Sequence, residues 1–96
     1  MTLPLHTLAA RTRAMIEADV DGEVVGLSPE TNVCFGFNRT ASELWRLLAT
    51  PQTLRALVQQ LTARFAVDDE TCTREVSETL IWMEQQGLAT LDRTPA

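Results

Sequence analysis

An Asp-Gly pair at positions 21 and 22 separates two short runs of residues that favour β-strands. Met15 to Val20 precede the pair, and Glu23 to Leu27 follow it. Both central positions of a tight hairpin turn need residues that tolerate positive φ, and Asp-Gly satisfies this need. The sequence therefore predicts two antiparallel strands joined by a two-residue turn.

A second turn and a third strand are expected directly after the hairpin. Ser28 to Thr31 has the composition of a turn, and Asn32 to Phe37 is strand-like. Side chains alternate between the two faces of a strand. We therefore expect one face of the strand, formed by Val33, Phe35 and Phe37, to point toward the core. Cys34 and Gly36 then lie on the opposite face.

The first helix is predicted to begin beside that strand and to end before Pro51. Thr40 and Glu43 have the spacing of a capping box, and Asn38 is an alternative N-cap. The apolar residues recur at helical spacing on one face. These core residues are Ala41, Leu44, Trp45 and Leu48.

Two further helices follow. One begins after the N-cap Thr53 and stops near Ala66, with a buried face made of Leu54, Leu57, Val58, Leu61 and Phe65. The next begins among acidic residues that suit the positive end of a helix dipole and ends at Gly87, which suits a left-handed C-terminal position. Its first residues are Asp68, Asp69 and Glu70, and its core residues are Val76, Leu80 and Met83. Leu88 to Leu91 is expected to form a short final strand.

This order of elements predicts an α+β fold of the winged helix-turn-helix type, with a three-stranded antiparallel sheet followed by three helices. The helices at 53–65 and 68–86 are the helix-turn-helix candidate. At 96 residues the chain is long enough for one domain, expected at 14–91, with a flexible tail at 1–13 and a short tail at 92–96. The N-terminus has the pattern of neither a signal peptide nor a membrane span, so a cytoplasmic protein is expected.

Charge argues against nucleic acid as a partner. The net charge is −5, and the basic residues, all arginine, are scattered along the chain. The expected recognition helix carries six acids from Asp68 to Gln86 against the single base Arg74. Carboxylates repel phosphates, so we expect no nucleic-acid binding despite the fold.

Catalytic and metal chemistry are not indicated either. The only histidine, His6, lies in the expected tail, so no Ser-His-Asp or Cys-His arrangement has a placed base. Helix capping accounts for the carboxylate pair Asp68 and Asp69. Cys34 and Cys72 stand far apart without metal-ligand spacing, which favours buried free thiols over a zinc site or a disulfide. We therefore expect a protein that is not an enzyme and needs no cofactor or metal.

Several stretches together resemble the PqqD-like family, which contains the precursor-peptide recognition elements of ribosomal natural-product pathways. They are VDGEVVGLSPET, VCFGFNRTASELWRLL, Pro51 with Thr53, Phe65-Ala66-Val67 and LIWMEQQGL. The matches run in the family's order from about Ala18 to Leu91. The whole pattern carries the resemblance, and one departure is Phe37, where the family usually has Leu before the Asn that opens its first helix.

The resemblance implies a non-catalytic domain that binds the leader region of a precursor peptide as a strand added to the third strand. It also implies that the peptide is handed to modifying enzymes. Free-standing members of this length, with cysteines placed like Cys34 and Cys72, look most like the proteins of lasso-peptide clusters. Those work with a separate leader-cutting cysteine protease and an ATP-dependent macrocyclase. The alternatives are a peptide chaperone for a radical enzyme in pyrroloquinoline-quinone synthesis and a winged-helix transcriptional regulator.

Strand addition needs a free edge beside an apolar groove, and one stripe of the third helix lies off its core face. The predicted peptide-binding residues are Asn32, Val33, Cys34, Phe35, Gly36, Phe37, Cys72, Glu75, Thr79 and Trp82. Trp82 either covers the edge of the core or faces the ligand, and Ile81 on the opposite flank is a rival marker for an enzyme partner. An exposed edge strand can also pair with its own copy, so a homodimer is an alternative.

Overall fold

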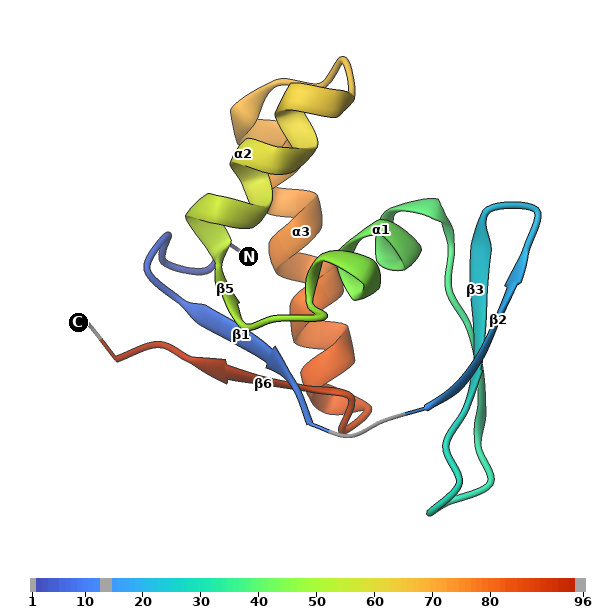
Figure 1. The fold of residues 1–96 in the computed structure, drawn as a ribbon. Coiled ribbons are helices and arrows are strands. Elements are labelled where there is room, and N and C mark those ends of the chain that lie inside the picture. The colour runs from blue at the N-terminus through green and yellow to red at the C-terminus, as the bar shows by residue number, and fades with distance from the viewer. Residues whose placement is uncertain (1, 13–14, 95–96) are drawn as a thin grey trace.

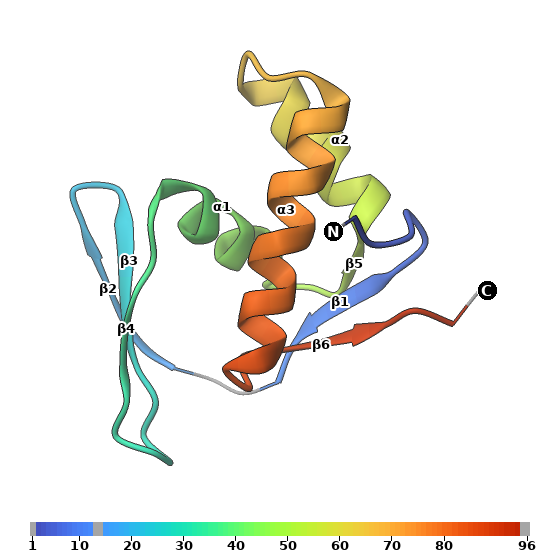
Figure 2. The ribbon, with the colours of Figure 1, turned by 180° about the vertical axis from the view of Figure 1, so that it is seen from behind.

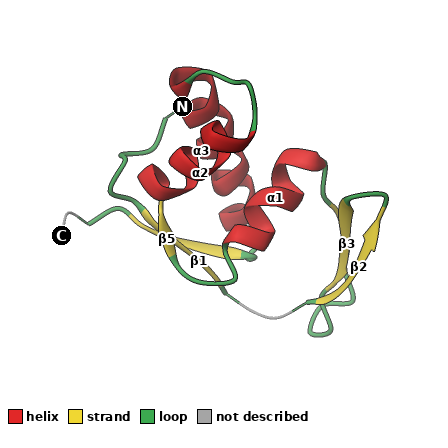
Figure 3. Ribbon diagram, turned by 45° about the horizontal axis from the view of Figure 1, so that its top comes forward, coloured by secondary structure: helices red, strands yellow, loops and turns green. Residues whose placement is uncertain are grey.

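The computed structural model describes residues 2–12 and 15–94, and within them two three-stranded antiparallel sheets lie on different sides of three helices (Figures 1 and 3). One sheet has the order β2-β3-β4, with β2 at Ile16–Val20, β3 at Glu23–Leu27 and β4 at Cys34–Gly36. The other has the order β5-β1-β6, with β1 at Leu8–Arg11, β5 at Gln52–Thr53 and β6 at Ala89–Asp92. The helices are α1 (Arg39–Leu47), α2 (Leu54–Arg64) and α3 (Asp69–Gln85). The predicted α+β class, a three-stranded antiparallel sheet followed by three helices, is confirmed.

The second sheet was not predicted, and it corrects the expectation of a flexible N-terminal tail. Within that tail β1 pairs with β6 and with the short β5, and Ala9 is completely buried. Met1 and Arg13 lie outside the described residues. The final strand exists but is β6, displaced by one residue from the predicted 88–91, so Asp92 belongs to a strand and not to a C-terminal tail. The sequence missed β1 because its partners are far away along the chain.

The β2-β3 hairpin forms as predicted. Asp21 and Gly22 have φ values of 53° and 86°, and Val20 pairs with Glu23 across the turn. Positive φ at both central positions is what an Asp-Gly turn provides.

The third strand is shorter than predicted, and Val33 does not face the core. β4 begins at Cys34, and the side chain of Val33 is 44% exposed. Asn32 has a φ of 56°, and the carbonyl of Val33 accepts a hydrogen bond from the Ser28 amide. This turn geometry interrupts the alternation of faces, which holds only from residue 34 onward.

The start of α1 is capped by Asn38, the alternative in the prediction, and not by Thr40. Asn38 Oδ1 accepts a hydrogen bond of 2.9 Å from the Ala41 amide. Glu43 does not close a capping box, because its carboxylate pairs with Arg46 and Arg64. The other predicted helix signals are confirmed: Thr53 and Asp68 cap α2 and α3, and Gly87 has a φ of 74°.

The helix faces that periodicity predicted form part of the core, together with residues of both sheets. It contains Ala41, Leu44, Trp45, Leu48, Leu54, Leu57, Val58, Leu61, Val76, Leu80 and Met83, all buried. Phe65 is the exception, since α2 ends at Arg64 and the Phe65 side chain is 38% exposed. None of the described helices is long and apolar enough to cross a membrane.

Candidate functional site

β4 lies at the edge of its sheet. Within the described part of the chain it pairs with β3 on one side and with no strand on the other. The Phe37 amide donates to the Val24 carbonyl, and the Val33 carbonyl accepts from Ser28. Backbone groups alternate in direction along an antiparallel strand. The N–H and C=O groups of Cys34 and Gly36 therefore point toward the open side.

α3 stands beside this edge, and both lie on the face of the molecule seen in Figure 2. Trp82 of α3 contacts Phe35 and Phe37 edge to face, with ring centroids 6.3 Å and 6.0 Å apart. Edge-to-face pairs of this kind are a favourable aromatic geometry. Trp82 is nevertheless 37% exposed. It covers the two phenylalanines and also presents part of its ring to solvent.

A cavity of about 330 Å³ lies between the end of β4, the start of α1 and the second half of α3. We call it the β4 cavity. Its lining residues are Gly36, Phe37, Asn38, Ala41, Glu78, Thr79 and Trp82. The open strand edge thus ends at a hollow that could receive a side chain of a bound chain.

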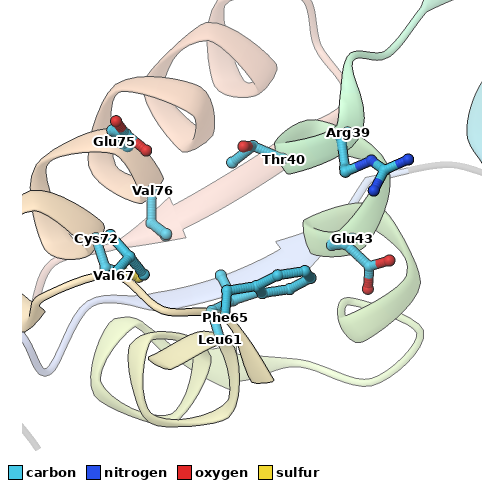
Figure 4. A pocket seen from close by; sticks show the side chains of 9 residues that line it. All are labelled: Arg39, Thr40, Glu43, Leu61, Phe65, Val67, Cys72, Glu75 and Val76. Atoms are coloured by element: carbon cyan, nitrogen blue, oxygen red, sulfur yellow. The ribbon is translucent and has the colours of Figure 1, made fainter. Parts of the chain in front are cut away.

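A second cavity, of about 240 Å³, lies among the three helices (Figure 4). We call it the helix cavity. Its lining residues are Arg39, Thr40, Glu43, Leu61, Phe65, Val67, Cys72, Glu75 and Val76. The early end of α2 explains part of this hollow, because the half-exposed Phe65 lies at its side and not in the core.

Both cavities follow the same face of α3. Cys72, Glu75 and Val76 line the helix cavity, and Glu78, Thr79 and Trp82 line the β4 cavity one turn later. Residues three and four apart are neighbours on a helix surface. The two hollows are therefore consecutive along one wall, which ends beside the open edge of β4.

The structure brings together only part of the predicted site. Gly36, Phe37, Thr79 and Trp82 meet at the β4 cavity, while Cys72 and Glu75 line the helix cavity. Phe35 is buried beneath Trp82. The side chains of Asn32, Val33 and Cys34 are exposed and line neither cavity. These three residues can therefore contact a ligand along the strand edge but not inside either cavity.

Sequence reasoning missed the walls that α1 and α2 contribute. The missed lining residues are Asn38, Arg39, Thr40, Ala41, Glu43, Leu61, Phe65, Val67, Val76 and Glu78. The sequence pattern assigns Asn38 and Thr40 to capping, and Ala41 and Leu61 to the core. The helical spacing could have predicted that Glu78 lines the groove. It lies off the core stripe of α3 and follows Glu75 on the same side of the helix.

Charges are distributed unevenly around the cavities. Glu43 is neutralised by Arg46 at 3.2 Å and Arg64 at 2.9 Å, and Arg46 also pairs with Asp19. No ion pair joins Glu75, Glu78 or Arg39 to any described residue. The wall formed by α3 is therefore the acidic one.

The two cysteines differ, which corrects the expectation that both are buried. Cys72 is buried, whereas Cys34 is exposed on the outer face of the sheet. Burial raises the pKa of the Cys72 thiol, and the neighbouring carboxylates Glu75, Asp69 and Asp68 raise it further. Cys72 is thus a neutral, weakly polar part of the cavity wall at physiological pH.

The acidic, cysteine and histidine side chains of the described residues form no metal site. Among residues 2–12 and 15–94, no group of three or more His, Cys, Asp or Glu side chains is arranged to hold a metal ion. His6 Nε2 lies 2.9 Å from the Arg93 carbonyl, which places it beside the second sheet. Asp68 accepts from the Thr71 amide, and this hydrogen bond lowers the pKa of the Asp68 carboxyl, as expected for a cap.

The chain is similar to known proteins in sequence and in fold. The family model described as Coenzyme PQQ synthesis protein D (PqqD) matches residues 23–89. A solved structure described as TbiB1 in complex with the TbiA(beta) leader peptide is 26% identical, with a TM-score of 0.74. The similarity covers 91% of this chain and 99% of that one. No curated protein matches the chain.

Proposed function

The chain belongs to the PqqD family, and on that premise we propose that it binds the leader region of a ribosomally made precursor peptide by adding the peptide as a strand to β4. It does so without catalysing a reaction. The observation that carries the proposal is the open edge of β4, which ends at the β4 cavity against α3.

The backbone of β4 supplies the affinity in this proposal. Cys34 and Gly36 direct their amide and carbonyl groups to the open side, so a peptide strand can form regular hydrogen bonds there. The β4 cavity and the helix cavity then supply selectivity by accepting side chains. The solved structure similar to this chain contains a leader peptide, which supports the same class of ligand here.

Delivery to enzymes completes the proposed role. We propose that the bound leader is presented to a separate leader peptidase of the cysteine protease type and to a macrocyclase in a lasso-peptide pathway. The resemblance to free-standing recognition elements supports this part. The second candidate is a peptide chaperone for a radical enzyme, and the description of the matching family as a PQQ synthesis protein favours it. The two candidates require the same peptide-binding edge and differ in the precursor that binds.

An NMR titration tests the proposed function. The ¹⁵N-labelled protein is titrated with a panel of leader peptides from lasso-type precursors and from the pyrroloquinoline-quinone precursor. We expect saturable shifts in residues 32–37 and along the α3 face that lines both cavities. Shifts confined to α2, with none in β4, would overturn strand addition. If the protein binds a DNA duplex and none of the peptides, the result would favour a winged-helix transcriptional regulator.

A further inference from the structure

Glu75 and Glu78 place two carboxylates beside the two cavities, one at each hollow. Both side chains are exposed, and neither forms an ion pair with a described residue. They are one helical turn apart, which corresponds to roughly 4.5 Å along the axis of α3. A ligand that covers this wall must therefore lie against both of them.

The opposite wall neutralises little of this charge. Arg64 forms an ion pair with Glu43, and Arg46 forms ion pairs with both Glu43 and Asp19. Among the described residues, Arg39 is the only cationic one that lines either cavity, and it projects from α1 on the far side of the helix cavity from Glu75 (Figure 4). Arg74 lies one turn before Glu78 but lines neither cavity.

The remaining lining of the helix cavity is largely apolar, with Leu61, Phe65, Val67 and Val76 exposed to it. A peptide side chain that fills this space displaces water from the nearby carboxylate. A carboxylate that loses water without gaining a cation is destabilised, whereas one that gains a cation is not. The cavity therefore requires an apolar side chain and favours a positive charge close to it.

We propose that this groove selects leader peptides that carry Lys or Arg beside their apolar anchors. This inference rests on the proposed function and adds the charge of the peptide that the site prefers. An extended chain repeats each face every two residues, which is roughly 6.6 Å. A basic residue two positions from an apolar anchor thus reaches Glu75 or Glu78 while the anchor occupies a cavity.

A displayed peptide library tests the proposal. The probe is a bead library of extended peptides in which every position is Leu, Tyr, Lys, Gln or Glu, sorted with fluorescently labelled protein. We expect binders to be enriched in Lys and depleted in Glu two residues from Leu or Tyr. For a selected peptide, replacing that Lys by Gln should weaken binding about two- to fivefold at low salt. The difference should shrink as salt screens the exposed charges.

Two double variants show whether the preference comes from these carboxylates. Glu75→Gln with Glu78→Gln removes two charges at the groove, and Glu23→Gln with Glu70→Gln removes two exposed charges that line neither cavity. The first should keep the Leu and Tyr enrichment and lose the Lys preference. The second should retain both, and NMR spectra should show that both are folded.

The outcomes distinguish charge selection from peptide binding itself. Binders without a charge preference, or a Lys preference that survives in the Glu75 and Glu78 variant, overturn the charge selection alone. A library and a leader panel that both yield no binder overturn the proposed function together with it.

Discussion

Alternation along β4 determines which atoms of single residues are available to a partner. Phe35 and Phe37 point inward, where Trp82 covers them, while Cys34 is exposed on the outer face. The same alternation turns the amide of Cys34 away from β3, because the amide of Phe37 and the carbonyl of Val33 point toward it. One residue thus exposes both its side chain and its backbone donor.

This backbone direction leads to a prediction for Cys34. Cys34→Pro removes the outward amide donor, and proline is tolerated on an edge strand when its missing N–H faces away from the sheet. We expect leader-peptide affinity to fall about two- to tenfold, the value of one net hydrogen bond, with little change in melting temperature. Isothermal titration calorimetry measures the affinity.

Cys34→Ala is the matched control for this substitution. It removes the thiol but keeps the amide, so its affinity should equal that of the unmodified chain. An equal loss in both variants would show that the thiol, and not the backbone, contacts the peptide.

At the scale of elements, the start of α1 links the sheet to the helices. Asn38 caps α1 directly after β4, and its neighbours Gly36 and Phe37 line the same cavity. A chain of ion pairs then runs from Asp19 in β2 through Arg46 and Glu43 in α1 to Arg64 in α2. The position of the strand edge relative to the groove therefore depends on how α1 begins.

The identity of the cap gives a prediction of stability. Asn38→Ala should lower the free energy of unfolding by about 1 kcal/mol, because the Ala41 amide loses its acceptor. Thr40→Ala should cost less than half of that, since Asn38 and not Thr40 is the N-cap of α1. Urea denaturation followed by circular dichroism measures both. A larger loss for Thr40→Ala would restore the capping box that the sequence suggested.

At the scale of the molecule, the N-terminal segment ties the chain together. β1 lies between β5, which leads directly into α2, and β6, which follows α3. Leu3, Thr7 and Ala9 are buried, and the Arg11 guanidinium lies 4.2 Å over the ring centre of the buried Trp45. The second sheet therefore contributes to the same core that supports the groove.

Removal of this segment should destabilise the whole domain. A chain that begins at Thr12 loses the burial of Leu3 and Ala9 and the central strand of its sheet, a loss of roughly 3 kcal/mol or more. In a domain of this size we expect the melting temperature to fall by more than about 10 °C. Thermal unfolding followed by tryptophan fluorescence measures the change.

Arg11→Gln is the control, because it keeps the strand and removes the contacts of the Arg11 guanidinium with Trp45 and Glu17. Its melting temperature should change far less than that of the shortened chain. Equal stability of the shortened and full chains would show that the first eleven residues add nothing to the stability of the fold.

Local patterns alone predicted the elements that depend on nearby residues. The Asp21-Gly22 hairpin, the caps Thr53 and Asp68, and the buried faces of the helices follow from turn chemistry, capping and periodicity, which act over a few residues. The family resemblance, confirmed by the match over residues 23–89, also came from the sequence. It pointed to β4 and α3 as the binding surface.

Only the tertiary structure decided how distant parts meet. β1 is a strand because β6 lies beside it, and no pattern within residues 8–11 specifies that partner. The early end of α2, which leaves Phe65 beside α1 and α3, explains part of the helix cavity. The acidic side of the groove depends on which carboxylates pair with arginines: Glu43 pairs with two, whereas Glu75 and Glu78 pair with none of the described arginines. Such pairings depend on distances in space, which a linear sequence does not contain.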